Sequence, residues 1–307
     1  MDKDDNYFEF ILKALRSRYG IDFCLYRAST IRRRMARRMA ARGFDTYRAY
    51  FCSLEEAPHE YAYLMKDLTI KVSRFFRNHL TFDFLSKEIL PAILREKKVL
   101  RDDTLRIWCA GCASGEEVYS ICITLMECFE KLGESVEKYH VSIFGTDIDE
   151  GALSKAMTAA YSPEALRETR LDILSKYFIR TEEAGTGWPG KFTCLTSKYH
   201  VIEPVKNLAH FCIHDLASKT RKSPPAGIVA NYDLILCRNL LIYFSKPLQE
   251  RAFSNLISSL NPGGYLVLGK AESIPEDLEA ALLTQDSSKR VYRKSPKPLR
   301  QPNGILQ

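Results

Sequence analysis

The residues with the clearest chemical meaning lie in the segment 105–120, LRIWCAGCASGEEVYS. An apolar run stops at Gly111 and Gly115 and gives way to helical periodicity, which predicts the strand, glycine turn and helix of an α/β nucleotide-type site. In a dinucleotide site the first helical turn presents free N–H groups to a pyrophosphate. Here Glu116 and Glu117 occupy that turn and would repel a phosphate, so the pattern favours a cationic ligand.

An acidic residue after the next apolar run supports this interpretation. Asp147 stands in VSIFGTDID where a second parallel strand would end, the place from which an acid binds a ribose diol. The interval from Gly115 to Asp147 exceeds the roughly 20 residues usual in nicotinamide sites. A glycine turn alone would equally fit a tight strand-to-helix connection. Combined with the acids, it indicates S-adenosylmethionine as cofactor and S-adenosylhomocysteine as product.

Cys109 and Cys112 have the C-x-x-C spacing of a redox dithiol or of half a zinc site. No second Cys or His pair of ligand spacing lies nearby, and the other cysteines are irregularly spaced. The interpretation as reduced thiols at the end of a buried strand is therefore favoured, and no metal is expected.

Composition indicates a globular protein, because 46% of the 307 residues are hydrophobic. The N-terminal MDKDDNYFEF lacks the apolar region of a signal peptide. No stretch approaches the ~20 apolar residues of a membrane span. We therefore expect a cytoplasmic protein without membrane insertion.

Residues 1–70 are expected to form a small all-helical domain. Its helices are predicted in the ranges 6–25, 31–42 and 46–67. Thr30 is the expected N-cap of the second helix, whose apolar face holds Ile31, Met35 and Met39.

The second helix carries much of the positive charge of the chain. Residues 26–50 hold eight arginines and one acid, Asp45, a local charge of +7 that equals the formal net charge of the whole chain. Concentrated charge implies an acidic partner, a solvated basic face being the alternative. No base-reading motif supports sequence-specific binding of nucleic acid. The expected substrate-docking residues are Arg32, Arg33, Arg34, Arg37 and Arg38.

Residues 71–103 are expected to link two domains. They contain SRFFRN and a helix over 80–97 that Pro91 should kink or divide. From 104 to 293 strand-like and helical runs alternate, which predicts an α/β domain with a mostly parallel sheet and helices on both faces. The strands are expected at 105–109, 141–146, 209–214, 232–237 and 265–268, and the intervening helices include 117–131, 150–160 and 247–260.

Three further segments have distinct compositions. Residues 261–264, NPGG, are expected to turn into the last strand. Between 177 and 205, short β-rich pieces broken by glycines predict a small antiparallel insertion. The tail over 294–307 is Pro-rich and basic, and we expect it to be disordered.

Five motifs, SRFFRN, ASGEEVYSI, GTDID, YDLILCRNLLIYF and GKAES, occur in the order and spacing of a known family. The chain resembles the chemotaxis receptor methyltransferases of the CheR type, from the Arg-rich helix to VYRK near the end. The resemblance implies a Rossmann-like class I S-adenosylmethionine-dependent sheet with a small β-subdomain, preceded by a helical domain. It also implies methyl-ester formation on glutamates in acidic helical cytoplasmic regions of chemoreceptors. We expect a monomer.

The resemblance also implies roles for individual residues. Together with Gly111 of the glycine turn, the implied cofactor-binding residues are Ser73, Arg77, Glu117, Asp147, Asp215, Leu216, Arg238 and Asn239. Asp147 would bind the ribose, and the pair at 215–216 would lie beside the adenine. Arg77, Arg238 and Tyr243 are the implied catalytic residues. Two positions depart from the family: Lys71 replaces a common Asn, and Lys270 replaces the His of G-H-x-E-S.

The implied reaction needs no general base, because a glutamate with a pKa of about 4.3 is ionised at neutral pH. Catalysis would then come from alignment and exclusion of water. Arg77 and Arg238 would orient carboxylates, and Tyr243 would shape the methyl passage. A methyltransferase for another acidic protein and a non-catalytic cofactor-binding signalling module are the alternatives. RNA methylation is disfavoured, because CRNLLIYF stands where an N-P-P-Y-type loop would be required.

Overall fold

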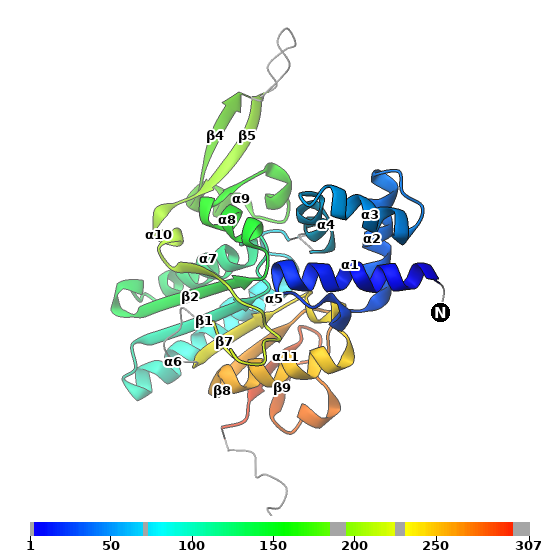
Figure 1. The fold of residues 1–307 in the computed structure, drawn as a ribbon. Coiled ribbons are helices and arrows are strands. Elements are labelled where there is room, and N and C mark those ends of the chain that lie inside the picture. The colour runs from blue at the N-terminus through cyan, green and yellow to red at the C-terminus, as the bar shows by residue number, and fades with distance from the viewer. Residues whose placement is uncertain (1–2, 70–72, 185–194, 225–230, 297–307) are drawn as a thin grey trace, which may run out of the picture. The chain divides into compact units, whose positions relative to one another are not determined.

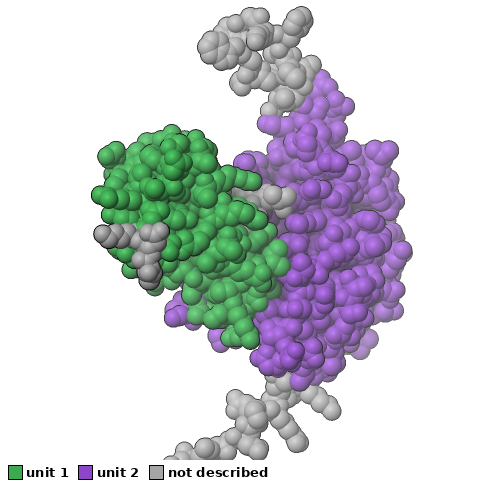
Figure 2. Space-filling view, turned by 90° about the vertical axis from the view of Figure 1, so that its right-hand side faces the viewer, with its two compact units in different colours: residues 1–71, 240–252 green, residues 72–239, 253–307 purple. Residues whose placement is uncertain are grey.

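The structure, a computed structural model, divides into two compact units, coloured separately in Figure 2. It describes residues 3–69, 73–184, 195–224 and 231–296. Unit 1 comprises residues 1–71 and 240–252, and unit 2 comprises residues 72–239 and 253–307. The sequence had placed 240–252 within the α/β domain, whereas the contacts group this segment with the N-terminal helices.

Unit 1 is helical, as the sequence predicts. Its elements are α1 (Lys3–Tyr19), the 3-10 turn η1 (Phe23–Leu25), α2 (Ala28–Ala41), α3 (Tyr47–Glu56), α4 (Glu60–Leu68), the 3-10 turn η5 (Leu241–Tyr243) and the first residues of α11 (Lys246–Ser259) (Figure 1). The predicted apolar face of α2 is confirmed, because Ile31, Met35 and Met39 are all buried in one core. That core also contains residues of α1, α3 and α4.

Three details of unit 1 differ from the sequence expectation. The first helix, predicted over 6–25, ends at Tyr19 and is followed by the separate turn η1. α2 begins at Ala28, before the predicted Thr30 cap, because a neighbouring segment fixes Arg27: its N–H donates to the carbonyl of Tyr243 at 2.8 Å. The third predicted helix is two helices, since Ala57 precedes Pro58 and leaves helical geometry. A contact with a distant segment therefore sets the start of α2, and a proline sets the break between α3 and α4.

Unit 2 is built on a seven-stranded sheet with the order β6-β2-β1-β7-β8-β10-β9. The first five of these strands are parallel, and β10 runs antiparallel to both β8 and β9. The strands are β1 (Thr104–Ala110), β2 (His140–Asp147), β6 (Ala209–Ile213), β7 (Tyr232–Cys237), β8 (Leu260–Leu268), β9 (Leu282–Asp286) and β10 (Val291–Lys294). All five predicted strands are present.

Helices and short turns precede the first strand and connect the others. They are α5 (His79–Phe84), the π-helical turn η2 (Leu85–Ile89), α6 (Leu90–Leu100), α7 (Glu116–Lys131), η3 (Val136–Lys138), α8 (Glu150–Thr158), η4 (Pro163–Leu166), α9 (Leu171–Tyr177), α10 (Glu203–Lys206), the rest of α11 and η6 (Glu276–Leu278). The helix predicted over 80–97 is divided as expected, with Pro91 in the first turn of α6. None of the described helices is long and apolar enough to cross a membrane.

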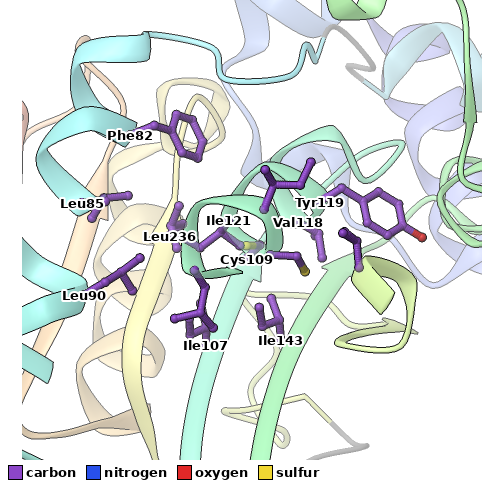
Figure 3. Close-up of a cluster of buried hydrophobic side chains, with 14 of the residues drawn as sticks. Phe82, Leu85, Leu90, Ile107, Cys109, Val118, Tyr119, Ile121, Ile143 and Leu236 are labelled. Atoms are coloured by element: carbon purple, nitrogen blue, oxygen red, sulfur yellow. The ribbon is translucent and has the colours of Figure 1, made fainter. Parts of the chain in front are cut away.

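The main core lies between one face of the sheet and the helices α5 to α7 (Figure 3). Ile107 and Cys109 of β1 point into it together with Ile121 of α7. Trp108, between them in sequence, must point to the opposite face, where its ring lies 5.5 Å from that of Tyr232. Because both faces are covered, β1 is apolar along most of its length.

The residues at 261–264 were wrongly expected to form a turn. They belong to β8, which begins at Leu260 and pairs with β7 through a register shift between Tyr232 and Leu234. Gly263 has a φ of 79° there, so glycine provides an irregular strand entry instead of a separate turn.

The predicted antiparallel insertion is confirmed in the described residues. β4 (Phe178–Ala184) pairs antiparallel with β5 (Leu195–Val201), and the short β3 (Ala160–Tyr161) covers the other side of β5. The glycine-containing pieces at 185–194, Lys71, and most of the predicted tail, 297–307, lie outside the described residues.

Candidate cofactor site

The glycine loop joins β1 to α7 at the carboxyl end of the parallel sheet, where ligands bind in open α/β folds. Gly111 and Gly115 have φ values of 75° and 88°, which glycine adopts without a steric penalty. A Cβ on Gly115 would lie 2.8 Å from the Cβ of Ala156, so the helix start also needs its small size. The N–H of Gly111 donates to the carbonyl of Thr146 and ties the loop to β2.

Asp147 ends β2 and faces this loop. Its Oδ2 accepts from the N–H of Ala113 at 2.9 Å, and its Oδ1 accepts from the N–H of Asp149 at 3.0 Å. Burial raises the pKa of Asp147, although these backbone bonds favour the charged form. The carboxylate is therefore fixed where a ribose diol would meet the strand end, and further lone pairs remain to accept its hydroxyls.

Glu117 and Arg238 form a buried ion pair. Arg238 Nη1 lies 2.8 Å from Glu117 Oε2, with side-chain exposures of 0% and 14%. Arg238 Nη2 donates to the carbonyl of Arg77 at 2.8 Å, whereas its Nε is buried without a partner among the described residues. Burial raises the pKa of Glu117, and Arg238 opposes that shift. This enclosed guanidinium therefore joins the end of β7, the first turn of α7 and the Arg77 loop.

The Arg77 loop is held from three sides. The N–H of Phe75 donates to the carbonyl of Ala165 at 3.0 Å, the N–H of Phe76 donates to Ser120 Oγ at 2.9 Å, and Arg238 binds the Arg77 carbonyl. Phe76 has a φ of 51°, an unfavourable value for a non-glycine residue. Such a conformation persists only where the surroundings enforce it, so the loop is built to place Arg77.

Glu116 was noted in the sequence beside Glu117 but was not among the predicted cofactor-binding residues, and the structure buries it at the glycine loop. Only 6% of it is exposed, and its Oε2 is buried without a hydrogen-bond partner in the described part of the chain. Burial raises its pKa, while a hydrogen bond from Ser73 lowers it. The predicted residue Ser73 thus lies beside the first turn of α7. The doubled acid in ASGEE was the available signal.

The predicted pair Asp215 and Leu216 follows β6. Asp215 Oδ1 accepts from the N–H of Ala217 at 2.9 Å, and the carbonyl of Leu216 accepts from Asn255 Nδ2 at 2.8 Å. The preceding N–H, of His214, donates to the carbonyl of Asp147 at 3.1 Å. The loop after β6 is therefore anchored to the end of β2 next to the ribose-binding candidate.

The remaining candidates divide between the two units. Asn239 follows Arg238 in unit 2, and its N–H donates to Glu272 at 2.9 Å. Tyr243 belongs to η5 of unit 1. Its place beside the transferred methyl group stays a prediction from the resemblance.

Three of the five predicted docking arginines have partners inside unit 1. Arg32 Nη1 binds Asp5 at 2.8 Å, Arg34 Nη1 donates to the carbonyl of Asp67 at 2.9 Å, and Arg38 binds Glu60 through two bonds of 2.7 Å. The Glu60 side chain is 3% exposed, and its pKa is lowered chiefly by Arg38. These arginines therefore stabilise the helical unit.

Arg33 and Arg37 differ from the other three. Both are exposed, and neither has an ion-pair partner within the residues described. They lie four positions apart on α2, so they share one face of the helix. The free positive charge of this helix is concentrated on these two residues.

The two cysteines of the C-x-x-C spacing are buried free thiols. Burial raises the pKa of both well above the usual value, so they are protonated and unreactive at neutral pH. Among the described residues, no group of three or more His, Cys, Asp or Glu side chains is arranged to hold a metal ion.

The acids of the site converge on the glycine loop. Burial raises the pKa of the Cys112 thiol most, and the negative charges of Asp147, Glu117 and Glu116 raise it further. All three carboxylates therefore lie close to this thiol. Such a donor set suits a ligand with a ribose and positive charge and disfavours a phosphate. S-adenosylmethionine fits this chemistry.

Comparison with known proteins agrees with this geometry. The family model for the CheR methyltransferase S-adenosylmethionine-binding domain matches residues 71–289, and the model for the CheR all-alpha domain matches residues 6–69. A chemotaxis protein methyltransferase of Listeria innocua is 28% identical over 284 residues, which cover 92% of this chain and 95% of the relative. Chemotaxis protein methyltransferase 2 of Pseudomonas aeruginosa is 29% identical over 285 residues, covering 93% and 91%. The chain therefore belongs to the CheR methyltransferase family and has its S-adenosylmethionine-binding domain.

Proposed function

We propose that this methyltransferase transfers a methyl group to glutamate side chains in acidic helical cytoplasmic regions of chemoreceptors. The names of the relatives, which are chemotaxis protein methyltransferases, support a role in chemotaxis. When bound, S-adenosylmethionine supplies an activated methyl group. The product on the protein would be a glutamate methyl ester.

The observation that carries this proposal is the kind of charged group that the site contains. Two of the carboxylates gathered at the glycine loop are already engaged, Glu117 by the Arg238 guanidinium and Asp147 by two backbone N–H groups. His214 also lies at this edge, but only 5% of it is exposed, and it packs against Trp108. A glutamate acceptor is already ionised at neutral pH and needs no base.

Arg77 is our candidate for orienting a carboxylate. Its loop is fixed by two hydrogen bonds at backbone atoms: the Phe76 N–H donates to Ser120, and Arg238 donates to the Arg77 carbonyl. These bonds do not depend on the Arg77 side chain. We therefore expect Arg77→Ala to abolish methyl transfer while the circular dichroism spectrum and the melting temperature stay near those of the parent. An active Arg77→Ala variant would remove this residue from the site.

The acidic protein would dock on the exposed face of α2 that carries Arg33 and Arg37. Opposite charges on the two surfaces accelerate encounter and select the partner. A glutamate-rich helix supplies the complementary charge along one face. This docking role is independent of cofactor binding, since both arginines belong to unit 1 and the cofactor-binding candidates described above belong to unit 2.

The direct test is methyl transfer from S-adenosylmethionine to a chemoreceptor cytoplasmic fragment, with the modified residues mapped by mass spectrometry. We expect modification of glutamates on one helical face. A fragment in which those glutamates are replaced by alanine is the matched control. Methylation of lysine, or equal labelling of the control fragment, would contradict the proposal.

A further inference from the structure

Glu272 is a buried carboxylate that joins the ends of two neighbouring strands. It follows β8, and only 4% of it is exposed. Its Oε2 accepts from the N–H of Gly269 at 2.6 Å and from the N–H of Asn239 at 2.9 Å. β7 ends two residues before Asn239, and β8 ends immediately before Gly269. One oxygen atom therefore bridges the exits of both strands.

The Asn239 end of this bridge has a strained backbone. Asn239 has a φ of 61°, in the left-handed region that a residue with a side chain occupies at a cost. A charged acceptor binds an N–H more strongly than a neutral one, so Glu272 is suited to hold this conformation. Asn239 directly follows Arg238, so the same turn sets the direction from which Arg238 reaches Glu117 and the Arg77 carbonyl.

The packing around Gly269 shows how closely the carboxylate is fitted. A Cβ on Gly269 would lie 2.7 Å from Glu272 Oε2 and 2.8 Å from the Asn239 nitrogen. No real Cβ is tolerated at such distances from a backbone atom. The glycine is therefore what lets the carboxylate and the two strand ends approach one another.

Glu272 also acts electrostatically on the Glu117–Arg238 ion pair. After burial, the negative charge of Glu272 also raises the pKa of Glu117, so the two carboxylates lie near each other. A buried carboxylate is costly unless hydrogen bonds and a nearby cation compensate it. Here two N–H groups bind it directly.

We propose that Glu272 is a positioning residue of the cofactor site, which holds the turn after β7 so that Arg238 and Asn239 are set for S-adenosylmethionine. The inference rests on the proposed cofactor-binding roles of these two residues. It does not depend on the identity of the methyl acceptor, because its readout is cofactor binding alone.

The test compares cofactor affinity and melting temperature in the 307-residue chain and its Glu272→Ala and Glu272→Gln variants. Isothermal titration with S-adenosylmethionine gives the Kd without any acceptor protein. We expect Glu272→Ala to raise the Kd about tenfold or more, which is about 1.4 kcal/mol. Glu272→Gln keeps an oxygen for both N–H groups, so its Kd should stay within about threefold of the parent value.

Asp233→Asn is the matched control, because Asp233 is another buried carboxylate that accepts a backbone N–H, at the opposite end of β7. It should lower the melting temperature and leave the Kd unchanged. An unchanged Kd in Glu272→Ala would overturn the proposal. The proposal would also be overturned if Glu272→Gln bound the cofactor as weakly as Glu272→Ala, or if Asp233→Asn lost as much cofactor affinity. If Glu272→Ala does not fold, the shorter Glu272→Asp replaces it under the same criteria.

Discussion

Reversing the charge of Arg33 and Arg37 should weaken binding of the protein substrate without weakening binding of the cofactor. Both side chains are exposed on α2 and have no ion-pair partner among the described residues, so the double change to Glu should leave unfolding free energy within about 0.5 kcal/mol. An exposed ion pair contributes about 0.2–1 kcal/mol. Reversal replaces that attraction with a repulsion of similar size, so two sites together give about 2 kcal/mol, or roughly 30-fold in KM for the protein.

The assay is steady-state methyl transfer to a chemoreceptor fragment at low salt and again at about 1 M salt, where the Debye length falls to ~3 Å. The KM difference should shrink at high salt, while the Kd for S-adenosylmethionine stays constant. Lys13→Glu with Arg48→Glu is the control, since both residues are exposed in unit 1 outside α2. An unchanged KM, an equal effect of the control, or a salt-independent effect would refute the docking face.

Three further predictions concern the buried charges. Arg38→Glu should destabilise the protein by about 3–5 kcal/mol in urea unfolding, because it sets a second carboxylate against buried Glu60; a change below about 1 kcal/mol would contradict that role. Arg238→Ala should lower the free energy of unfolding by a similar amount and abolish cofactor binding, because Glu117 is left buried and unpaired. Arg238→Lys should restore only part of the stability and part of the cofactor affinity. Because burial raises the pKa of Asp147 and Glu117, these acids take up protons at higher pH than ordinary carboxylates. Cofactor affinity measured by titration calorimetry should therefore fall as the pH is lowered from about 7 to about 5, and a constant affinity would exclude a charge role for them.

The parts of the fold that followed from sequence are those set by local pattern. The run at 105–109 is β1, because a central strand covered on both faces needs consecutive apolar residues. β9 and β10 were not predicted, since LLTQD and VYRK are short and mix apolar with polar side chains; β9 is the edge strand and β10 lies between it and β8. Their pairing depends on a partner strand that a local pattern does not reveal.

The parts of the site that did not follow from sequence depend on distant partners. Arg38 counted as free positive charge because its partner, Glu60, lies 22 residues away and is buried only in the folded unit. The role of Arg238 at the cofactor stays a prediction, but its pairing with Glu117, which lies 121 residues away in the sequence, could not be found from a local pattern. Glu272 stood in a quoted motif, yet its role appears only when the exits of β7 and β8 are seen side by side.

The central claim, methyl transfer to a carboxylate, is tested most directly by the stability of the product in mild alkali. The chain is incubated with S-adenosylmethionine carrying a radioactive methyl group and with an acidic chemoreceptor cytoplasmic fragment. The labelled fragment is then treated with alkali. A glutamate methyl ester hydrolyses and releases the label as volatile methanol, which is the result we predict. Label that stays on the protein after alkali would show methylation of an amine or another stable acceptor, and would contradict the proposed reaction.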